Sequence, residues 1–385
     1  MRAMDSAISP SPRIHPLAER IRAAAADKTP LRIRGGGSKD FHGLALQGEV
    51  LDTRALAGIV SYEPSELVVT VMAGTPLAEL EAVLAAQGQC LAFEPPHCAA
   101  GATVGGMVAA GLSGPARASV GAVRDFVLGL EMVNGRGELL RYGGQVMKNV
   151  AGYDVSRLMA GSWGTLGLIT EVSLKVLPVA PAEATLRFAC SQPQALQWLN
   201  QWGGQPLPLN ASCWLQEPAQ TEGTLYLRLR GARAAVQAAC RRLIGECGGE
   251  PLPNDQVAAD WAACREQALP WFAERSADCC LWRLSVPQTA PVLALPPDCT
   301  GPFIEWHGAQ RWVQAPRGLG APLQALAASV GGSATLFRAE SAGQISAAPV
   351  FDAAAGSALA ILHQRLKQAF DPEGIFNRGR LASAW

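Results

Sequence analysis

The chain has 385 residues, of which 49% are hydrophobic, and this length is enough for two domains with separate cores. Lysine plus arginine and aspartate plus glutamate each number 32, so the net charge is near zero and nucleic acid is not expected as a partner. The first residues lack the apolar core of a signal peptide, and no apolar run reaches the roughly 18 residues of a membrane helix. A cytoplasmic protein is therefore expected.

Ten cysteines are spread over residues 90 to 299, without a C-x-x-C pair and without a spacing typical of a zinc or iron–sulfur site. Most of them are expected to be reduced core thiols. The sequence therefore predicts no metal site on this chain.

The first part of the chain alternates between short apolar runs and glycine-rich segments. Residues 31–34 predict a short strand that leads directly into three glycines. Residues 67–72 predict another strand, and a helix follows it, with Thr75 as its N-cap and Pro76 at its first position. Leucines at i, i+3 and i+7 continue this helix until a glycine ends it.

Residues 101–125 are too rich in glycine and other small residues for an ordinary helix or strand. Two apolar runs then flank Asn134-Gly135, a dipeptide typical of hairpin turns. Residues 168–176 alternate and predict a strand. Pro178 to Pro181 indicate a domain boundary.

Beyond this boundary, strands alternate with helices, which favours an α+β domain with an antiparallel sheet. Strands are predicted at 185–190, 212–216, 224–231, 281–286, 311–315 and 334–339, and helices at 193–202 and 232–247. The tail carries a predicted helix at 359–370, followed by DPEGIFNRGRL.

Two glycine-rich loops, residues 34–39 and 101–114, are the strongest chemical signal. Backbone N–H groups in such loops converge on phosphate oxygens because no Cβ blocks the approach. Neither loop matches a Walker motif or the Rossmann fingerprint, and each taken alone is more often a turn. Together with the glycine-rich segment 161–167, they favour a diphosphate-bridged dinucleotide over a single phosphate.

Several ordered strings resemble the vanillyl-alcohol-oxidase/PCMH type of FAD-binding family: RGGGSK, EPP followed by ATVGGMVAAGLSGP, VMKNVAGYD, SRLMAGSWGTLG and DPEGIFNRGRL. The resemblance covers nearly the whole chain. It implies an α+β fold, with a PCMH-type FAD-binding domain of two α/β subdomains at 1–178. It also implies a smaller, shortened α+β cap domain with an antiparallel sheet at 179–345, and a C-terminal segment, 346–385, that returns to the flavin domain.

The resemblance implies FAD as the cofactor. Ser38 stands where some covalent relatives have histidine, so noncovalent FAD is expected. The cofactor-binding residues that the resemblance implies are Arg34, Gly35, Gly36, Gly37, Ser38 and Lys39 in the first loop, Pro95 and Pro96 before the second, Ala102, Thr103, Gly105, Gly106, Gly111 and Ser113 along the ribityl chain and pyrophosphate, Gly161, Gly164, Thr165, Gly167 and Ile169 along the nucleotide half, and Asn377 near the isoalloxazine.

The chain also departs from the family pattern. Trp163 replaces an acid that many relatives have, and the metal-ligating H-x-x-G-D-G-N-type motif of the large catalytic relatives is absent. No catalytic residue is therefore assigned. His42 and His97 are more often structural than acid/base groups. A polar cluster is expected near the third glycine-rich segment, 161–167, and consists of Lys148, Tyr153, Asp154 and Arg157. Alternatively, Asp154 is simply the N-cap of a helix.

The resemblance implies a FAD-dependent oxidoreductase that acts on the CH–OH group of a 2-hydroxy acid as one subunit of a complex. The expected reaction is oxidation of glycolate to glyoxylate, with electrons passing to an iron–sulfur subunit and a quinone-linked acceptor. A larger FAD/metal-type catalytic subunit is a further expected partner, and contact with the inner face of a membrane would come through partners. Two alternatives stay open: a standalone 2-hydroxy-acid dehydrogenase, and a structural subunit with a vestigial flavin site.

Overall fold

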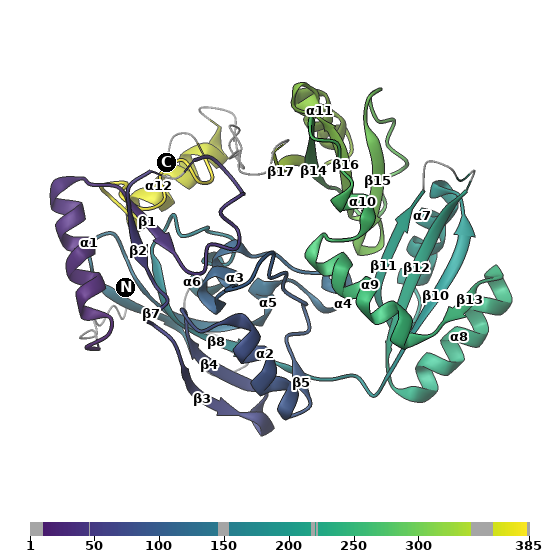
Figure 1. Cartoon of the computed structure of the whole chain (residues 1–385), viewed down its shortest axis with the longest axis horizontal. Coiled ribbons are helices and arrows are strands. Elements are labelled where there is room, and N and C mark those ends of the chain that lie inside the picture. Colours follow the sequence, from purple (N-terminus) through teal and green to yellow (C-terminus); the bar gives the residue numbers. More distant parts are fainter. Residues whose placement is uncertain are drawn as a thin grey trace.

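The computed structural model describes residues 11–45, 47–144, 154–216, 220, 222–339 and 357–382. Figure 1 shows two α+β units side by side. We call residues 11–178 together with 357–382 the N-terminal unit, and residues 182–339 the cap. The chain enters the cap at β10 and, after β17, returns to the N-terminal unit as α12.

A five-stranded antiparallel sheet forms the base of the N-terminal unit, in the order β3-β4-β8-β6-β7. Helices α2 and α3 pack their apolar side chains against it in one core. The elements are β3 (Ile59–Glu63), β4 (Val68–Met72), α2 (Leu77–Ala86), β5 (Gln89–Cys90), α3 (Val104–Ala110), α4 (Arg117–Val120), α5 (Val123–Phe126), β6 (Val127–Val133), β7 (Leu139–Gly143), α6 (Val155–Leu158), β8 (Leu168–Lys175) and β9 (Leu177–Pro178).

A smaller layer covers the sheet at one end. It contains α1 (His15–Asp27), the parallel pair β1 (Leu31–Arg34) and β2 (Glu49–Asp52), and α12 (Ala358–Phe370). Its core joins Leu31 and Leu168 to Ile375 and Phe376 of the tail. Because β8 packs against both cores, most of its side chains on both faces are buried, and its burial pattern does not alternate.

The tail is fixed to this layer by backbone and side-chain bonds. The Leu31 amide donates to the Ile375 carbonyl at 2.8 Å, and the Asn377 amide donates to the Leu31 carbonyl at 2.9 Å. Lys367 forms a buried ion pair with Asp371, with 2.7 Å between Nζ and Oδ2. Lys367 Nζ also donates to the carbonyls of Thr165 and Phe376, at 2.7 and 3.1 Å. The last residues of the chain are thereby held against the first strand.

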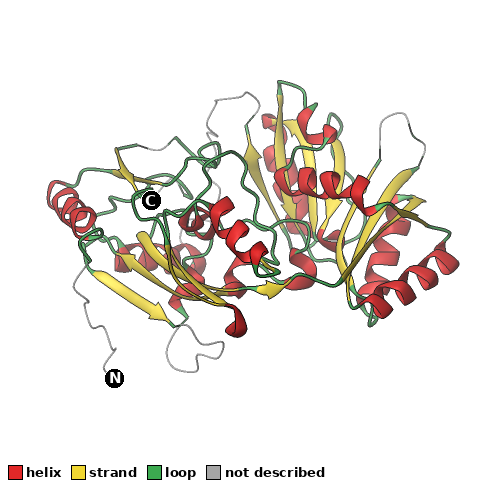
Figure 2. Ribbon diagram, turned by 60° about the horizontal axis from the view of Figure 1, so that its bottom comes forward, coloured by secondary structure: helices red, strands yellow, loops and turns green. Residues whose placement is uncertain are grey.

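The cap is built on an eight-stranded antiparallel sheet in the order β13-β10-β12-β11-β15-β16-β14-β17. Figure 2 shows helices on both faces of this sheet. The strands are β10 (Ala182–Cys190), β11 (Leu209–Leu215), β12 (Gly223–Gly231), β13 (Glu250–Leu252), β14 (Cys279–Ser285), β15 (Thr300–Glu305), β16 (Gln310–Pro316) and β17 (Ser333–Arg338), and the helices are α7 (Gln192–Gly203), α8 (Arg233–Cys247), α9 (Asn254–Glu266), α10 (Pro270–Ala273) and α11 (Gly320–Ser329).

Most predicted elements are present at their predicted positions. The strands at 31–34 and 67–72, the hairpin around Asn134-Gly135 and the antiparallel sheet of the cap are all confirmed. The predicted N-cap is wrong: Pro76 caps α2, while Thr75 Oγ1 donates to the Met72 carbonyl and accepts from the Gly58 amide. Strand β15 and helices α9 and α11 had no counterpart in the sequence prediction.

Polar contacts fix the cap against the N-terminal unit. The carboxylate of Glu94 accepts from Arg228 at 2.7 Å and from Arg230 at 3.0 Å, both on β12. His307 lies buried between the units, with its ring nitrogens 2.9 and 3.0 Å from the hydroxyls of Ser119 and Ser212. Because these groups are withdrawn from water and paired, they specify one cap orientation.

Among the described helices, none combines the length and the apolar character that crossing a membrane would require.

Replacing Lys367 by methionine should lower the free energy of unfolding by about 3–5 kcal/mol, because it leaves the Asp371 carboxylate buried without its partner. Lys28→Met removes an exposed ion pair to Glu373 in the same tail and should cost about 1 kcal/mol or less. Urea denaturation of both variants checks this. Equal losses would contradict a structural role for the buried pair.

Candidate functional site

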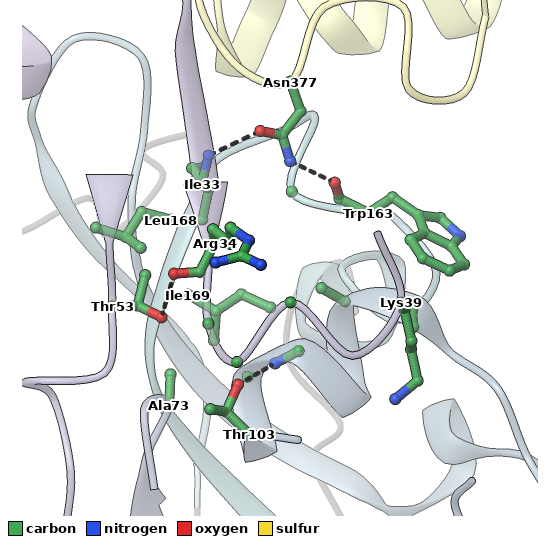
Figure 3. Close-up of a pocket in the computed structure, with 18 of the residues that line it drawn as sticks. Ile33, Arg34, Lys39, Thr53, Ala73, Thr103, Trp163, Leu168, Ile169 and Asn377 are labelled. Atoms are coloured by element: carbon green, nitrogen blue, oxygen red, sulfur yellow. Dashed lines mark hydrogen bonds between the residues drawn. The ribbon is translucent and has the colours of Figure 1, made fainter. Parts of the chain in front are cut away.

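A groove opens where the first glycine loop, α3 and the segment 163–169 meet (Figure 3). The cofactor-binding residues predicted from the sequence that line it are Arg34, Gly35, Gly36, Gly37, Ser38, Lys39, Thr103, Gly105, Gly106, Gly164, Gly167, Ile169 and Asn377. The structure thus brings all three predicted segments and the tail to one place.

The first loop offers a row of free backbone donors. Within the described chain, none of the five amides from Gly35 to Lys39 donates to a protein acceptor. The loop is held close to the second one: a Cβ on Gly36 would lie 1.6 Å from the Gly101 carbonyl oxygen. Successive unpaired amides in a turn form a concavity that suits an anion.

Gly105 lines the groove for a different reason from the one the sequence suggested. A Cβ on Gly105 would lie 2.6 Å from the Cβ of Ala73, the residue that follows β4. The Gly105 amide donates to the Ala73 carbonyl at 2.7 Å. The absence of a side chain on Gly105 therefore allows α3 to pack on the sheet. Thr103 next to it caps α3, because its hydroxyl accepts from the Gly106 amide at 3.2 Å.

Asn377 joins two of the three segments (Figure 3). Its Oδ1 accepts from the Ile33 amide at 2.8 Å, and its Nδ2 donates to the Trp163 carbonyl at 2.7 Å. The residue is buried and has a left-handed backbone, with φ of 41°. Asparagine tolerates this conformation better than most residues, and its amide supplies one acceptor and one donor.

Positive charge gathers at one end of the groove. Arg380 stacks over Trp163, with 5.1 Å from its guanidinium carbon to the ring, and donates from Nη2 to the Lys39 carbonyl at 2.7 Å. Its Nη1 is buried without a protein partner among the described residues. Burial lowers the pKa of Arg380 to about 10 and also lowers that of Lys39. Arg380 stays cationic at neutral pH, so this end of the groove attracts anions.

Sequence reasoning missed Arg380, although it follows Asn377 by three residues in the string NRGR. It also missed Ala109 and Ala110, which line the groove from the end of α3. Their small size was the available signal, because both alanines lie within the second glycine-rich segment, 101–114. Trp163 was noted for replacing an acid, and it lines the groove with its side chain beside Arg380.

His42 is buried and packs against the groove from the cap side. Its ring stacks on Trp163 at 4.5 Å, and its Nδ1 lies 3.2 Å from the Phe337 carbonyl on β17. Burial, helped by the charge of Arg283, lowers the pKa of His42 to about 3. It is therefore neutral at physiological pH. His97 instead contacts Glu81, with 2.9 Å between Nε2 and Oε2.

Some predicted residues lie outside the lining of this groove: Pro95, Pro96, Ala102, Gly111, Ser113, Gly161 and Thr165. Several have local structural contacts. A Cβ on Gly111 would lie 2.8 Å from the Gly161 nitrogen, and Ser113 Oγ accepts from the Val123 amide. Thr165 binds the Ser162 carbonyl through its hydroxyl. Direct contact of these residues with a cofactor stays a prediction.

Only part of the predicted polar cluster near the third loop lies within the described residues. Lys148 and Tyr153 lie outside the described residues. Asp154 is confirmed as an N-cap, because its side chain accepts from the Arg157 amide, and it pairs with the Arg157 guanidinium at 2.8 Å. In the described ranges, no group of three or more His, Cys, Asp or Glu side chains has the geometry to hold a metal ion.

Comparison with known proteins places the chain in a family. A family model described as an FAD binding domain matches residues 14–143. Over 366 residues the chain is 44% identical to glycolate oxidase subunit GlcE of Escherichia coli (strain K12), which covers 95% of this chain and 96% of that protein. The chain belongs to the GlcE family of glycolate oxidase subunits. The FAD-binding domain that the family resemblance implied is thereby confirmed over residues 14–143.

Other relatives of this GlcE-family chain match over shorter stretches. Glycolate oxidase subunit GlcD of Bacillus subtilis (strain 168) is 33% identical over 41% of this chain and 34% of that protein. A D-lactate dehydrogenase of Archaeoglobus fulgidus is 32% identical over 41% of this chain and 35% of that protein. The chain is thus related to FAD-linked oxidoreductases through a shared segment.

Solved structures confirm the α+β fold of the GlcE-family chain. A p-cresol methylhydroxylase with substrate bound superposes with a TM-score of 0.71 at 13% identity, covering 97% of this chain and 88% of that one. An alkyldihydroxyacetonephosphate synthase gives 0.65 at 15% identity, covering 95% and 74%. At these identities the likeness concerns the fold.

The buried neutral His42 should make stability depend on pH. Its pKa is near 6.5 in the unfolded chain and about 3 in the folded one, so between these values the unfolded chain binds one more proton. Stability therefore falls as the pH drops through this window, by up to about 1.4 kcal/mol per pH unit. His42→Gln should remove that part of the slope between about pH 6 and pH 4.

Urea unfolding at several pH values measures this slope. The matched control is His15→Gln, because His15 is exposed on α1, and this variant should keep the wild-type slope. An unchanged slope in His42→Gln would contradict the assignment of a buried, neutral imidazole.

Proposed function

We propose that the groove binds FAD noncovalently, with the FAD pyrophosphate against the first glycine loop. The observation that carries this assignment is the row of amides from Gly35 to Lys39, which have no acceptor in the described chain. The buried Nη1 of Arg380 is a further donor without a partner there. A set of unpaired amides beside cationic side chains suits a diphosphate better than a neutral ligand.

The sides of the groove suit the rest of the cofactor. Ala109, Ala110 and Gly164 are small enough to admit a long, flat molecule, and Ile169 adds an apolar surface. Among the described residues that line the groove there is no histidine or cysteine, the residues that attach flavins covalently. This composition supports noncovalent binding.

FAD supplies a ring that accepts a hydride from a CH–OH carbon. The part of this chain is to bind the cofactor and to orient it through the segments that Asn377 joins. His42 is neutral and has its Nδ1 directed at the Phe337 carbonyl, so it acts as packing beside the groove. We assign no proton-transfer residue.

We further propose that the chain works as a subunit of a glycolate oxidase complex that oxidises glycolate to glyoxylate. The oxidation removes two electrons and two protons, and the electrons would pass through flavin to an iron–sulfur partner and a quinone-linked acceptor. The similarity to GlcE along nearly the whole chain supports this role. The other proposed partner is the larger FAD/metal-type subunit, to which the similarity to GlcD points.

A standalone 2-hydroxy-acid dehydrogenase is the second candidate, because the matched segment is 32% identical to a D-lactate dehydrogenase. The chain lacks the metal-ligating motif of the large catalytic relatives, and the described residues contain no group of three metal-binding side chains. Both points favour the subunit.

Flavin content and turnover distinguish the candidates. The chain purified alone should carry about one FAD, with absorbance near 450 nm, because the cofactor site lies within it. Its glycolate-dependent reduction of an artificial acceptor should be on the order of 100-fold slower than that of the complex co-purified with its partners, in which iron is also counted.

Robust turnover by the chain alone would overturn the subunit role in favour of the dehydrogenase. Failure to take up FAD, even after incubation with it, would overturn the cofactor proposal.

A further inference from the structure

A large cavity lies within the cap, between one face of its sheet and the helices α9 and α10. Its volume is about 710 Å³, which is in the range of small-molecule sites. Strands β10, β11, β12, β15 and β16 line it on one side, and α9 and α10 line it on the other. None of the described residues that line it also lines the flavin groove. We call it the cap cavity.

Three aromatic side chains form walls of the cap cavity: Trp261, Trp271 and Tyr226. Trp261 is fixed by its Nε1, which donates to Thr185 Oγ1 at 3.0 Å. Trp271 packs against Phe303, with 5.5 Å between the ring centres. Aromatic rings that their neighbours hold in place present faces that attract a flat apolar group or a cation. The walls of the cavity therefore suit an organic ligand.

Two carboxylates line the same cavity without a protein partner. Asp260 lies on α9 and Glu274 follows α10, and both residues are exposed. Neither side chain forms a hydrogen bond or an ion pair with another described residue. By contrast, Glu250 on the edge strand of the same sheet pairs with Arg187. No lysine, arginine or histidine is among the described residues that line the cavity, so the charge of its lining is negative.

Gln314 adds a buried acceptor that lacks a donor. It lies on β16, lines the cavity and is 7% exposed. Its Nε2 donates to the Trp271 carbonyl, which fixes the orientation of the amide. Its Oε1 accepts no hydrogen bond from any other described residue. Because buried acceptors are normally paired, this oxygen is expected to receive a hydrogen bond from a bound molecule.

The arginines beside the aromatic walls do not cancel the two carboxylates. The guanidinium carbon of Arg228 lies 4.8 Å from the centre of the Trp261 ring, but the guanidinium pairs with Glu94 at 2.7 Å. Arg187 lies opposite Tyr226 in the ladder between β10 and β12, and its charge is taken up by the ion pair described above. Neither arginine lines the cavity. Both charges are thus compensated outside it.

We propose that the cap cavity binds an organic cation, a protonated amine that carries an apolar ring. The ring packs against the aromatic walls, and the ammonium group is attracted by these walls and by the two carboxylates. An ammonium N–H supplies the donor that the Gln314 side-chain oxygen lacks. The site is separate from the flavin groove, so the inference goes beyond the proposed function and does not depend on it.

The probe is 2-phenylethylamine, which is protonated at neutral pH, and the matched neutral probe is 2-phenylethanol. Isothermal titration of the FAD-loaded chain should show one amine site with a Kd below about 1 mM, and the alcohol should bind at least about tenfold more weakly. Asp260→Asn and Glu274→Gln should each weaken amine binding about threefold, because each removes an attraction between partly screened charges. Trp271→Leu should weaken it at least about fivefold and leave the flavin content unchanged.

The matched control is Asp255→Asn, which removes the same charge from the exposed first turn of α9, outside the cavity. It should change the amine affinity less than about 1.5-fold, because an exposed and distant charge is screened. Weakening equal to that of Asp260→Asn would indicate a general field effect and overturn the proposal.

Three other results would overturn it as well. One is the absence of amine binding by the wild type up to about 10 mM. Another is equal affinity for 2-phenylethanol, which would indicate an apolar pocket that does not select a cation. The third is full amine affinity in Trp271→Leu, which would place the amine elsewhere on the chain. Flavin absorbance is read on the same samples, so a failure of FAD binding is seen separately.

Discussion

The groove depends on one amide side chain that links segments far apart in the sequence. Asn377 binds the Ile33 amide at the end of β1 and the Trp163 carbonyl in the third glycine-rich segment. No strand pairing joins these two segments where Asn377 bridges them. Each of its hydrogen bonds contributes about 1 kcal/mol, and both partners are partly buried, so losing the side chain would leave two backbone groups without this partner.

The position of Asn377 is itself set by the buried pair of Lys367 and Asp371. Asp371 accepts from the amides of Ile375 and Phe376, at 3.0 and 2.8 Å, which curls the tail after α12. Lys367 ties the same turn to Thr165 of the third segment. A charged pair buried in an apolar core is weak evidence for stability but specifies geometry, and here it fixes where the tail meets the groove.

Local sequence patterns predicted much of the fold, because many helices, strands and turns are indicated by residues that lie close together in the sequence. The strand at 31–34, the hairpin at Asn134-Gly135 and helix α8 follow from periodicity and turn residues within a few positions. The boundary of α2 was misplaced by one residue, because Thr75 found partners at Gly58 and Met72 that competed with the cap role. Arg380 and the stack of His42 on Trp163 arise from contacts between segments more than 100 residues apart, which no local pattern encodes.

The resemblance to a known family predicted which segments would meet, and the structure places them around one groove. Physical reasons for individual residues were harder to predict. The absence of a side chain on Gly105 lets α3 approach Ala73. The absence of a side chain on Gly36 lets the first glycine loop contact the second. Glycine patterns alone do not distinguish contact with a ligand from close packing of the backbone.

The most direct test is the affinity for FAD of the Asn377→Leu variant, measured by titrating the cofactor into the FAD-free protein. The account predicts an affinity roughly 10- to 30-fold weaker than wild type, because about 2 kcal/mol of hydrogen bonding that aligns the segments is lost. Asn200→Leu makes the same change at an exposed site on α7 and should leave the affinity unaltered. Wild-type affinity in Asn377→Leu would contradict the claim that this side chain assembles the cofactor site.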